Sequence, residues 1–283
     1  MKTKKIRFII LLSVLFFAFV SCDINNKLNI PDAQSTDTKS IEDNTDAELT
    51  VINVFQNIYN YGIYGDLEKS YTQSTDTNNY VIRTINNNKV ILDFSLCDNQ
   101  KGKIIIDFSD SPTYKNTKLT GEISFENYSY NNMKISGTGN MKMTHSIDTA
   151  GPNFTFNTDT LKFFKDNKTF LLGGKRDIIW KRGFQSLADR IDDEYLIYGN
   201  TWGINSDGIH YNVKIEKEKA LKKALSCEYI TEGEMTLTDY LDTEDEKSLI
   251  IDFAPGEDEE FCQCDSWLTI TVNGFTFKTN IDN

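Results

Sequence analysis

The residues that could carry acid–base or nucleophilic chemistry are few and lie apart in the sequence. His145 and His210 are the two histidines. Neither stands beside a nucleophile in a recognisable motif, so we expect both in turns or at strand edges. The sequence has no G-x-S-x-G, H-E-x-x-H, G-x-x-x-x-G-K-[ST] or G-x-G-x-x-G pattern. We therefore predict a non-enzymatic protein that uses no cofactor and no metal.

Carboxylates are plentiful and keep one catalytic alternative open. The acidic runs 242–246 and 257–260 lack the D-x-D-x-D-G spacing that directs alternate oxygens at one calcium ion, so solvated loops are expected there. A glycosidase pair depends on how far apart two carboxylates lie in space, which a sequence does not give. A carboxylate-based envelope hydrolase is therefore kept as the alternative to a binding protein.

Five cysteines raise questions of export and oxidation. After Cys22, the chain contains Cys97, Cys227, Cys262 and Cys264. Four cysteines in an oxidising compartment favour up to two disulfides, with three pairings open. Cys262 and Cys264 point the same way along a strand, so we expect each to pair with a distant partner, Cys97 or Cys227. Free thiols and a zinc site are the alternatives.

Tryptophans give the single hint of a binding surface. In the run 266–272, a period of two places Trp267 on the face opposite Leu268 and Ile270, so Trp267 is expected to be exposed. Trp202 lies among small residues where the backbone can bend. Exposed tryptophans stack on sugar rings or anchor protein partners, whereas Trp180, flanked by isoleucine, reads as core. Trp202 and Trp267 are therefore our candidate binding residues, for a glycan or a protein partner.

The first 22 residues predict where the protein sits. Four cations within residues 2–7 precede the apolar run 8–20, and Ser21 and Cys22 follow. This pattern is typical of a lipoprotein signal peptide (1–21), with the lipid carried on Cys22. An uncleaved membrane anchor is the alternative, but an apolar run this short falls below the roughly 20 residues that a bilayer core requires. We expect Cys22 to hold the protein at a membrane.

The net charge and the composition of the chain limit the classes of partner that it can bind. The chain has 30 basic and 42 acidic residues, and the leader removes four basic residues, so the mature chain carries 26 against 42 and a net charge of −16. Nucleic acid is a poor partner for such a surface. Residues 22–43 are polar with few periodic apolar positions, which predicts a flexible tether.

The remaining residues, 44–283, are expected to form a β-rich domain with one helix at its start. Thr45 and Glu48 have the T-x-x-E spacing of a capping box, and apolar residues recur every three to four positions up to Gly62. This predicts a helix over 46–61. A second, short helical turn is predicted within 216–225, where alanine and leucine recur at four-residue spacing.

From residue 80 onward, short runs rich in Ile, Val, Thr, Phe and Tyr alternate with Asn, Asp and Gly, which is typical of strands and turns. The fold class we predict is mainly β, with antiparallel β-meanders forming a large sheet or sandwich and the N-terminal helix packed on it. Asn273-Gly274 is a strong hairpin signal. Strands are predicted at 80–85, 89–95, 103–108, 119–126, 133–144, 153–163, 169–180, 194–198, 209–215, 227–237, 248–253, 266–272 and 275–277.

The sequence partly repeats itself. Residues 90–94, 104–108 and 249–253 are near copies, and the first and third precede Cys97-Asp98 and Cys264-Asp265. Duplication of a β-meander would give two similar halves, about 44–145 and 146–283. Because buried strands draw on few residue types, repetition by chance is the alternative.

Several segments together resemble a family. The runs 102–104, 121–128 and 135–138, followed in order by 163–180, 199–201, 227–230, 250–253 and 272–274, are similar to a set of Bacteroidetes lipoproteins. The resemblance implies a cell-envelope lipoprotein of mostly β structure, on the periplasmic or the surface side of the outer membrane, and brings no activity or catalytic residues. With the residues above, it leads us to expect a non-enzymatic binding module, with a carboxylate hydrolase or a lipid-binding carrier as alternatives.

Overall fold

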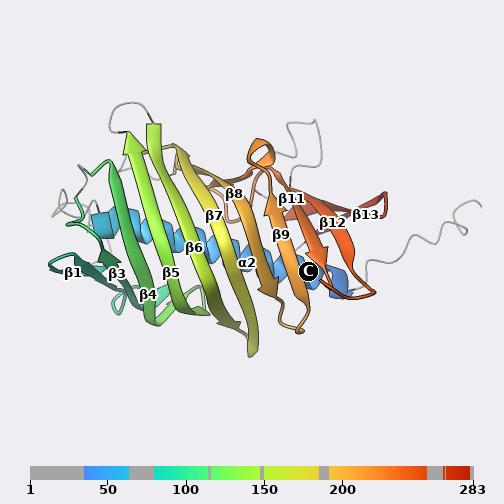
Figure 1. Ribbon diagram of the computed structural model, residues 1–283, viewed down its shortest axis with the longest axis horizontal. Coiled ribbons are helices and arrows are strands. Elements are labelled where there is room, and N and C mark those ends of the chain that lie inside the picture. The colour runs from blue at the N-terminus through green and yellow to red at the C-terminus, as the bar shows by residue number, and fades with distance from the viewer. Residues whose placement is uncertain are drawn as a thin grey trace, which may run out of the picture. The chain divides into compact units, whose positions relative to one another are not determined.

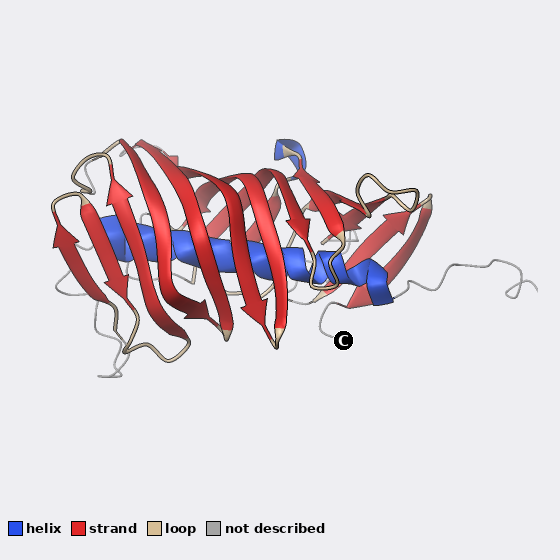
Figure 2. Cartoon of the chain, turned by 60° about the horizontal axis from the view of Figure 1, so that its bottom comes forward, coloured by secondary structure: helices blue, strands red, loops and turns tan. Residues whose placement is uncertain are grey.

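The computed structural model describes residues 35–63, 80–113, 116–146, 150–184, 191–253, 264 and 266–280. Residues 35–283 form one compact unit. It consists of a single 14-stranded antiparallel sheet and one long helix that lies across the strands on one face of the sheet (Figures 1 and 2). The predicted fold class, a mainly β protein with one N-terminal helix packed on its sheet, is confirmed.

The helix, α2, spans Ser35–Asn57 and continues as a π-helical segment, Ile58–Ile63. It begins about ten residues before the predicted start, so the prediction of a flexible tether is wrong for residues 35–43. Ser40, Ile41 and Asp43 are buried there. Ser40 and Asp43 have polar partners, the Asp239 carboxylate and the Ser206 amide, which explains why the segment resembles a solvated linker. The rest of the predicted tether, 22–34, lies outside the described residues.

The predicted capping box is also wrong, because its two residues lie inside the helix. The Glu48 carboxylate instead pairs with the Arg176 guanidinium of the sheet at 2.6 Å, and both side chains are 2% exposed. Arg176 also donates to the Thr201 hydroxyl at 2.7 Å. A buried ion pair needs such close geometry and added hydrogen bonds to offset desolvation. It fixes α2 against the middle of the sheet.

The strands follow the predicted segments closely and mostly extend beyond them. Burial alternates along them, so that exposed and buried residues take turns in His210–Ile215, because one face of the sheet covers α2 and the other faces solvent. The strands are β1 Ile82–Asn86, β2 Lys89–Asp93, β3 Gln100–Phe108, β4 Lys118–Tyr130, β5 Met133–Ser146, β6 Ala150–Lys165, β7 Lys168–Arg182, β8 Glu194–Ile204, β9 His210–Ile215, β10 Leu221–Ala224, β11 Glu234–Asp239, β12 Lys247–Asp252, β13 Trp267–Val272 and β14 Phe275–Asn280.

The sheet order is the chain order, apart from β10. Neighbouring strands pair from β1 to β9, then β11 to β14, and β10 pairs with β8 beside the end of β9. The β13–β14 hairpin turns at Asn273 and Gly274, both with positive φ, which confirms the predicted turn. The expected boundary between two similar halves falls between β5 and β6, which pair along much of their length. The two proposed halves are therefore parts of one continuous sheet, and their origin by duplication stays a prediction from the sequence.

Two predicted segments differ in part. Within 216–225, the helical turn is a 3₁₀ segment, Lys217–Lys219, but the next residues form strand β10 rather than a continued helix. The predicted strand 227–237 begins only at Glu234. Its first residues turn back on β10, where the Thr231 amide donates to the Lys222 carbonyl at 2.9 Å, and so cannot extend the sheet.

Bulges bend the long central strands around α2. The register shifts between Gly137 and Asn140 on β5 and between Thr158 and Leu161 on β6. Gly174 on β7 and Gly199 on β8 continue this line with φ values of 109° and 121°. An added Cβ at Gly174 would lie 2.7 Å from the Asn200 carbonyl oxygen, so the close approach of these strands requires glycine.

The core lies between α2 and the inner face of the sheet. Toward the C-terminal end of the helix, α2 presents Phe55 and the π-helical segment presents Tyr59. Phe55 packs edge-on to Phe156 at 5.2 Å between ring centroids, and Tyr59 packs on Trp180 at 4.9 Å. Toward its N-terminal end the contacts are polar, as in the 2.8 Å bond from the Ser40 hydroxyl to Asp239. Trp180 is a core residue, as predicted.

Candidate functional site

A hollow runs along one side of α2. Most helix residues are buried, but one stripe at three- and four-residue spacing is only partly buried. This stripe forms the floor of a cavity of about 550 Å³, which we call the groove. The stripe residues that line it are Lys39, Glu42, Asp46, Leu49 and Asn53.

The walls of the groove come from segments far apart in the sequence. One wall is formed by the β4–β5 turn, with Tyr130 and Asn131, and the β6–β7 turn, with Lys165–Lys168. The other wall is Lys223 on β10 and the segment that follows it, residues 225–229, which we call the strap. The groove therefore exists only in the folded protein, where the strap and the two turns lie on either side of the helix.

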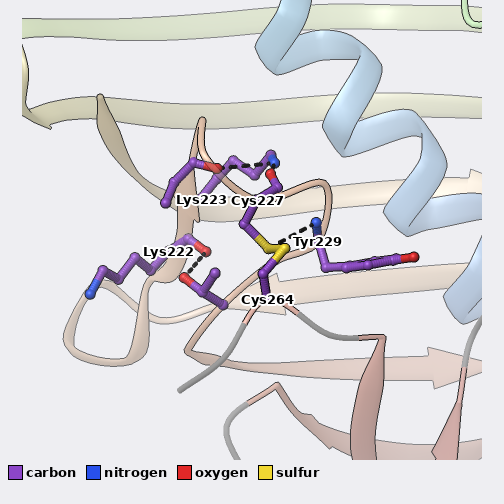
Figure 3. Close-up of a disulfide and its surroundings, with 7 residues drawn as sticks. Lys222, Lys223, Cys227, Tyr229 and Cys264 are labelled. Carbon is purple, nitrogen blue, oxygen red and sulfur yellow. Dashed lines mark hydrogen bonds between the residues drawn. A yellow bond between two sulfur atoms is a disulfide. The ribbon is translucent and has the colours of Figure 1, made fainter. Parts of the chain in front are cut away.

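A disulfide holds the strap. Cys227 of the strap is bonded to Cys264, with a Cα–Cα distance of 5.2 Å (Figure 3). The expectation that Cys264 pairs with a distant cysteine is confirmed. The expectation that Cys97 takes part in a second bridge is wrong, because Cys97 is a buried free thiol whose pKa is raised by burial. Cys262 lies outside the described residues.

Lys223 lies at the base of the strap and is 8% exposed. Its ammonium donates to the carbonyl oxygens of Ala224, at 3.2 Å, and of Cys227 (Figure 3). Burial lowers the pKa of Lys223 to about 8, and the nearby Glu228 carboxylate opposes that shift. Burial likewise raises the pKa of Tyr130 on the opposite wall, with a further contribution from Glu228. Glu228 therefore acts electrostatically on both walls.

At the N-terminal end of α2 the charges of the groove are paired. Lys39 lies 3.2 Å from Glu42 and 3.0 Å from Asp43. Burial lowers the pKa of Lys39, but the two carboxylates outweigh that effect and the pKa is raised. Lys165 bonds Asp46 at 2.7 Å. Each of these carboxylates therefore bonds an ammonium group within the groove.

Further along α2 the lining is apolar or uncharged. Leu49 and Ile52 rise from the helix, and the side chains opposite them are Met133, Phe170 and Leu225. Thr45 and Gln56 also line the groove, and both are buried. Such a mixture of apolar surface and a few placed polar groups is typical of small-molecule and peptide sites.

The tryptophans selected from the sequence lie on the other face of the sheet. Trp202 on β8 is 36% exposed and Trp267 on β13 is 41% exposed, so both are accessible as predicted. Three strands, β9, β11 and β12, separate them, so they do not form one surface. Trp202 lies against Gly173, and the Lys278 ammonium lies 4.8 Å from the Trp267 ring centroid.

The same outer face carries a second hollow of about 530 Å³ over β3–β6. It is more open than the groove, and exposed polar residues such as Glu122, Asn140 and Lys142 line it. None of these three side chains is buried, so water already satisfies them. We therefore do not treat this hollow as a candidate ligand site.

The other sequence candidates do not converge on either hollow. His210 is exposed at the start of β9, and the described acidic run 242–246 forms an exposed turn in which the Asp242 amide donates to Glu246. His145 lies in β5. Cys22 and the run 257–260 lie outside the described residues. Within the described ranges, no group of three or more metal-ligating side chains occurs and no helix has the length and apolar content of a membrane span.

Sequence reasoning missed the groove residues almost entirely. The stripe from Lys39 to Asn53 does have helical spacing, but Lys39 and Glu42 fall within the predicted tether, 22–43. Comparison with protein-family models, curated proteins and solved structures found no match to the chain. The function must therefore be argued from the groove itself.

Proposed function

We propose that this chain is a non-enzymatic binding protein of the cell envelope, anchored by lipid on Cys22 at the outer membrane, and that the groove beside α2 is its ligand site. The observation that carries the proposal is a cavity of about 550 Å³ whose lining combines apolar side chains, paired charges and buried polar groups. The leader residues 1–21 and the small residue before Cys22 support the anchoring.

Binding is favoured over hydrolysis by the state of the groove carboxylates. Glu42 and Asp43 are paired with Lys39, and Asp46 with Lys165. A hydrolase of the glycosidase type needs one carboxylic acid and one free carboxylate on either side of a bond. Each of these carboxylates already bonds an ammonium group, so they suit recognition.

One observation favours a second candidate, a lipid-binding carrier. Leu49, Met133 and Phe170 give the middle of the groove an apolar surface that an acyl chain could cover. The outer-face tryptophans, by contrast, are separated by three strands in the sheet order and line neither of the two hollows described above.

The groove can be tested by filling it. Leu49 projects from the partly buried stripe, so Leu49→Trp would occupy the space with few new core clashes. We expect native mass spectrometry of the wild-type chain, purified from its own envelope, to show an added ligand mass that Leu49→Trp loses. Trp267→Ala is the matched control and should keep the ligand. If Trp267→Ala lost the ligand mass and Leu49→Trp kept it, the ligand would bind at the outer face and the proposal would be wrong.

A further inference from the structure

Two polar groups on the floor of the groove have no hydrogen-bond partner among the residues that the structure describes. They are the Thr45 hydroxyl and the Gln56 amide nitrogen, and their side chains are 6% and 9% exposed. A buried polar group without a partner destabilises the folded protein, because no hydrogen bond offsets its loss of hydration. Both atoms are covered in the unliganded protein, so a ligand would supply the missing partner as each side chain turns toward the groove.

The spacing of these two groups sets a length. Thr45 and Gln56 are separated by three turns of α2, so both project from the same side of the helix. At a rise of 1.5 Å per residue they are about 16 Å apart along the axis. Leu49 and Ile52 lie between them and line the same groove. A ligand that reaches both polar groups must be elongated and must cover apolar side chains on the way.

An extended peptide meets these requirements. It rises about 3.3 Å per residue, so a segment of about five residues covers the distance. Each residue brings a carbonyl acceptor and an amide donor. A carbonyl can accept from the Gln56 amide while another main-chain group bonds the Thr45 hydroxyl. An acyl chain of the same length has no such groups along it and would leave the two side chains unpaired.

We infer that the groove binds an extended peptide segment of about five residues, held by main-chain hydrogen bonds to Thr45 and Gln56 and by apolar contact with Leu49 and Ile52. This inference rests on the proposed function, since it names the ligand class of the same groove. The charges along the walls fit a peptide of mixed charge, because each wall carries both signs: Asp166 and Lys168 on one, Lys223 and Glu228 on the other.

The test uses variants that remove one hydrogen-bonding group and keep the volume, Gln56→Leu and Thr45→Val. The full chain is immobilised and exposed to a mixture of capped pentapeptides built from Leu, Ser, Lys and Glu. The best-retained peptide is identified by mass spectrometry and titrated into each protein. We expect each variant to bind it about 3- to 10-fold more weakly, which is the loss of one hydrogen bond. Thr269→Val, on the outer side of β13, is the matched control and should bind like the wild type.

The same variants distinguish this inference from a structural effect. Because the two groups are unpartnered in the protein, their removal should leave the melting temperature of the unliganded variants at or above the wild-type value. A lower melting temperature with unchanged peptide affinity would overturn the inference. So would tight binding of palmitate or lysophosphatidylethanolamine that Gln56→Leu strengthens, although the groove would then still be the ligand site. Failure of Leu49→Trp to remove any ligand would instead overturn the proposed function.

Discussion

The inner and outer faces of the sheet use polar residues in different ways. On the inner face, polar side chains are buried and matched to particular partners, as Glu48 is to Arg176 and Ser40 to Asp239. On the outer face, polar side chains such as Glu122 and Asn140 are exposed and exchange partners with water. A polar group that is unmatched is thus unusual only on the inner face. Thr45 and Gln56 stand out among the unmatched groups of the described residues because they also line the groove, whereas the exposed tryptophans do not line it.

The comparison predicts that the largest loss of stability follows from breaking the inner ion pair. Glu48→Ala would leave the Arg176 guanidinium charged and buried, at a cost of about 3 to 5 kcal/mol in the free energy of unfolding. Urea denaturation measures this. Glu126→Ala, which breaks an exposed pair with Lys103, is the matched control and should cost about 1 kcal/mol or less. Equal effects of the two changes would show that the inner pair is solvated.

Removal of the Cys227–Cys264 disulfide should cause the second largest loss of stability. Replacing Cys227 and Cys264 together by alanine frees the strap and opens a loop with a sequence separation of 37. The expected loss is about 2 to 4 kcal/mol, through the entropy of the unfolded chain. Thermal unfolding with and without reductant checks it. Cys97→Ala changes a buried free thiol and should cost about 1 kcal/mol. A reductant effect that persists in the double variant would contradict the assignment of this bond.

The free energy of unfolding should depend on pH through Lys223, because this lysine is buried, whereas lysines of the outer face such as Lys118 are exposed. Its pKa is about 8 in the folded protein and 10.5 in the unfolded chain, so between these values the unfolded state binds more protons. Stability therefore rises as the pH rises from 8 toward 10.5, and the full penalty of burying the charge is present below pH 8.

The size of this effect can be measured against Lys223→Met. Between pH 7 and 9.5 the wild-type chain should gain about 2 kcal/mol in unfolding free energy relative to the variant. Lys118→Met, at an exposed position on β4, serves as the control and should show no such change. A difference that stays constant with pH would mean that Lys223 is fully solvated in its charged form.

The smallest effects should come from the outer tryptophans. Trp202→Ala and Trp267→Ala each remove a side chain that is more than a third exposed, so the loss in unfolding free energy should be about 1 kcal/mol or less. Denaturant midpoints of the two variants give this value. A loss above about 3 kcal/mol would show that the outer face is covered in solution and would weaken the contrast between the faces.

The sequence predicted those parts of the fold that depend on local rules. Alternation of apolar residues located β9, and Asn273-Gly274 located the last hairpin. It failed at residues 35–43, where the helix buries Ser40 and Asp43 against polar groups of the sheet. Apolar periodicity reports burial against apolar partners only, so a helix that packs on polar partners resembles a solvated tether.

The candidate site was beyond prediction for a related reason. Its floor comes from α2, its walls from turns near residues 130 and 165, and its strap from residues 225–229. No local pattern links these segments. Pairing of Cys264 with a distant cysteine was predictable, but that the bond would hold the wall of a groove was not.

The central claim is that the groove, rather than the outer face, holds the ligand. The most direct measurement is the electron density of the chain crystallised after purification from its own envelope. We predict continuous, elongated density along α2, within hydrogen-bond distance of Thr45 and Gln56. Density at Trp202 or Trp267 together with an empty groove would contradict the account.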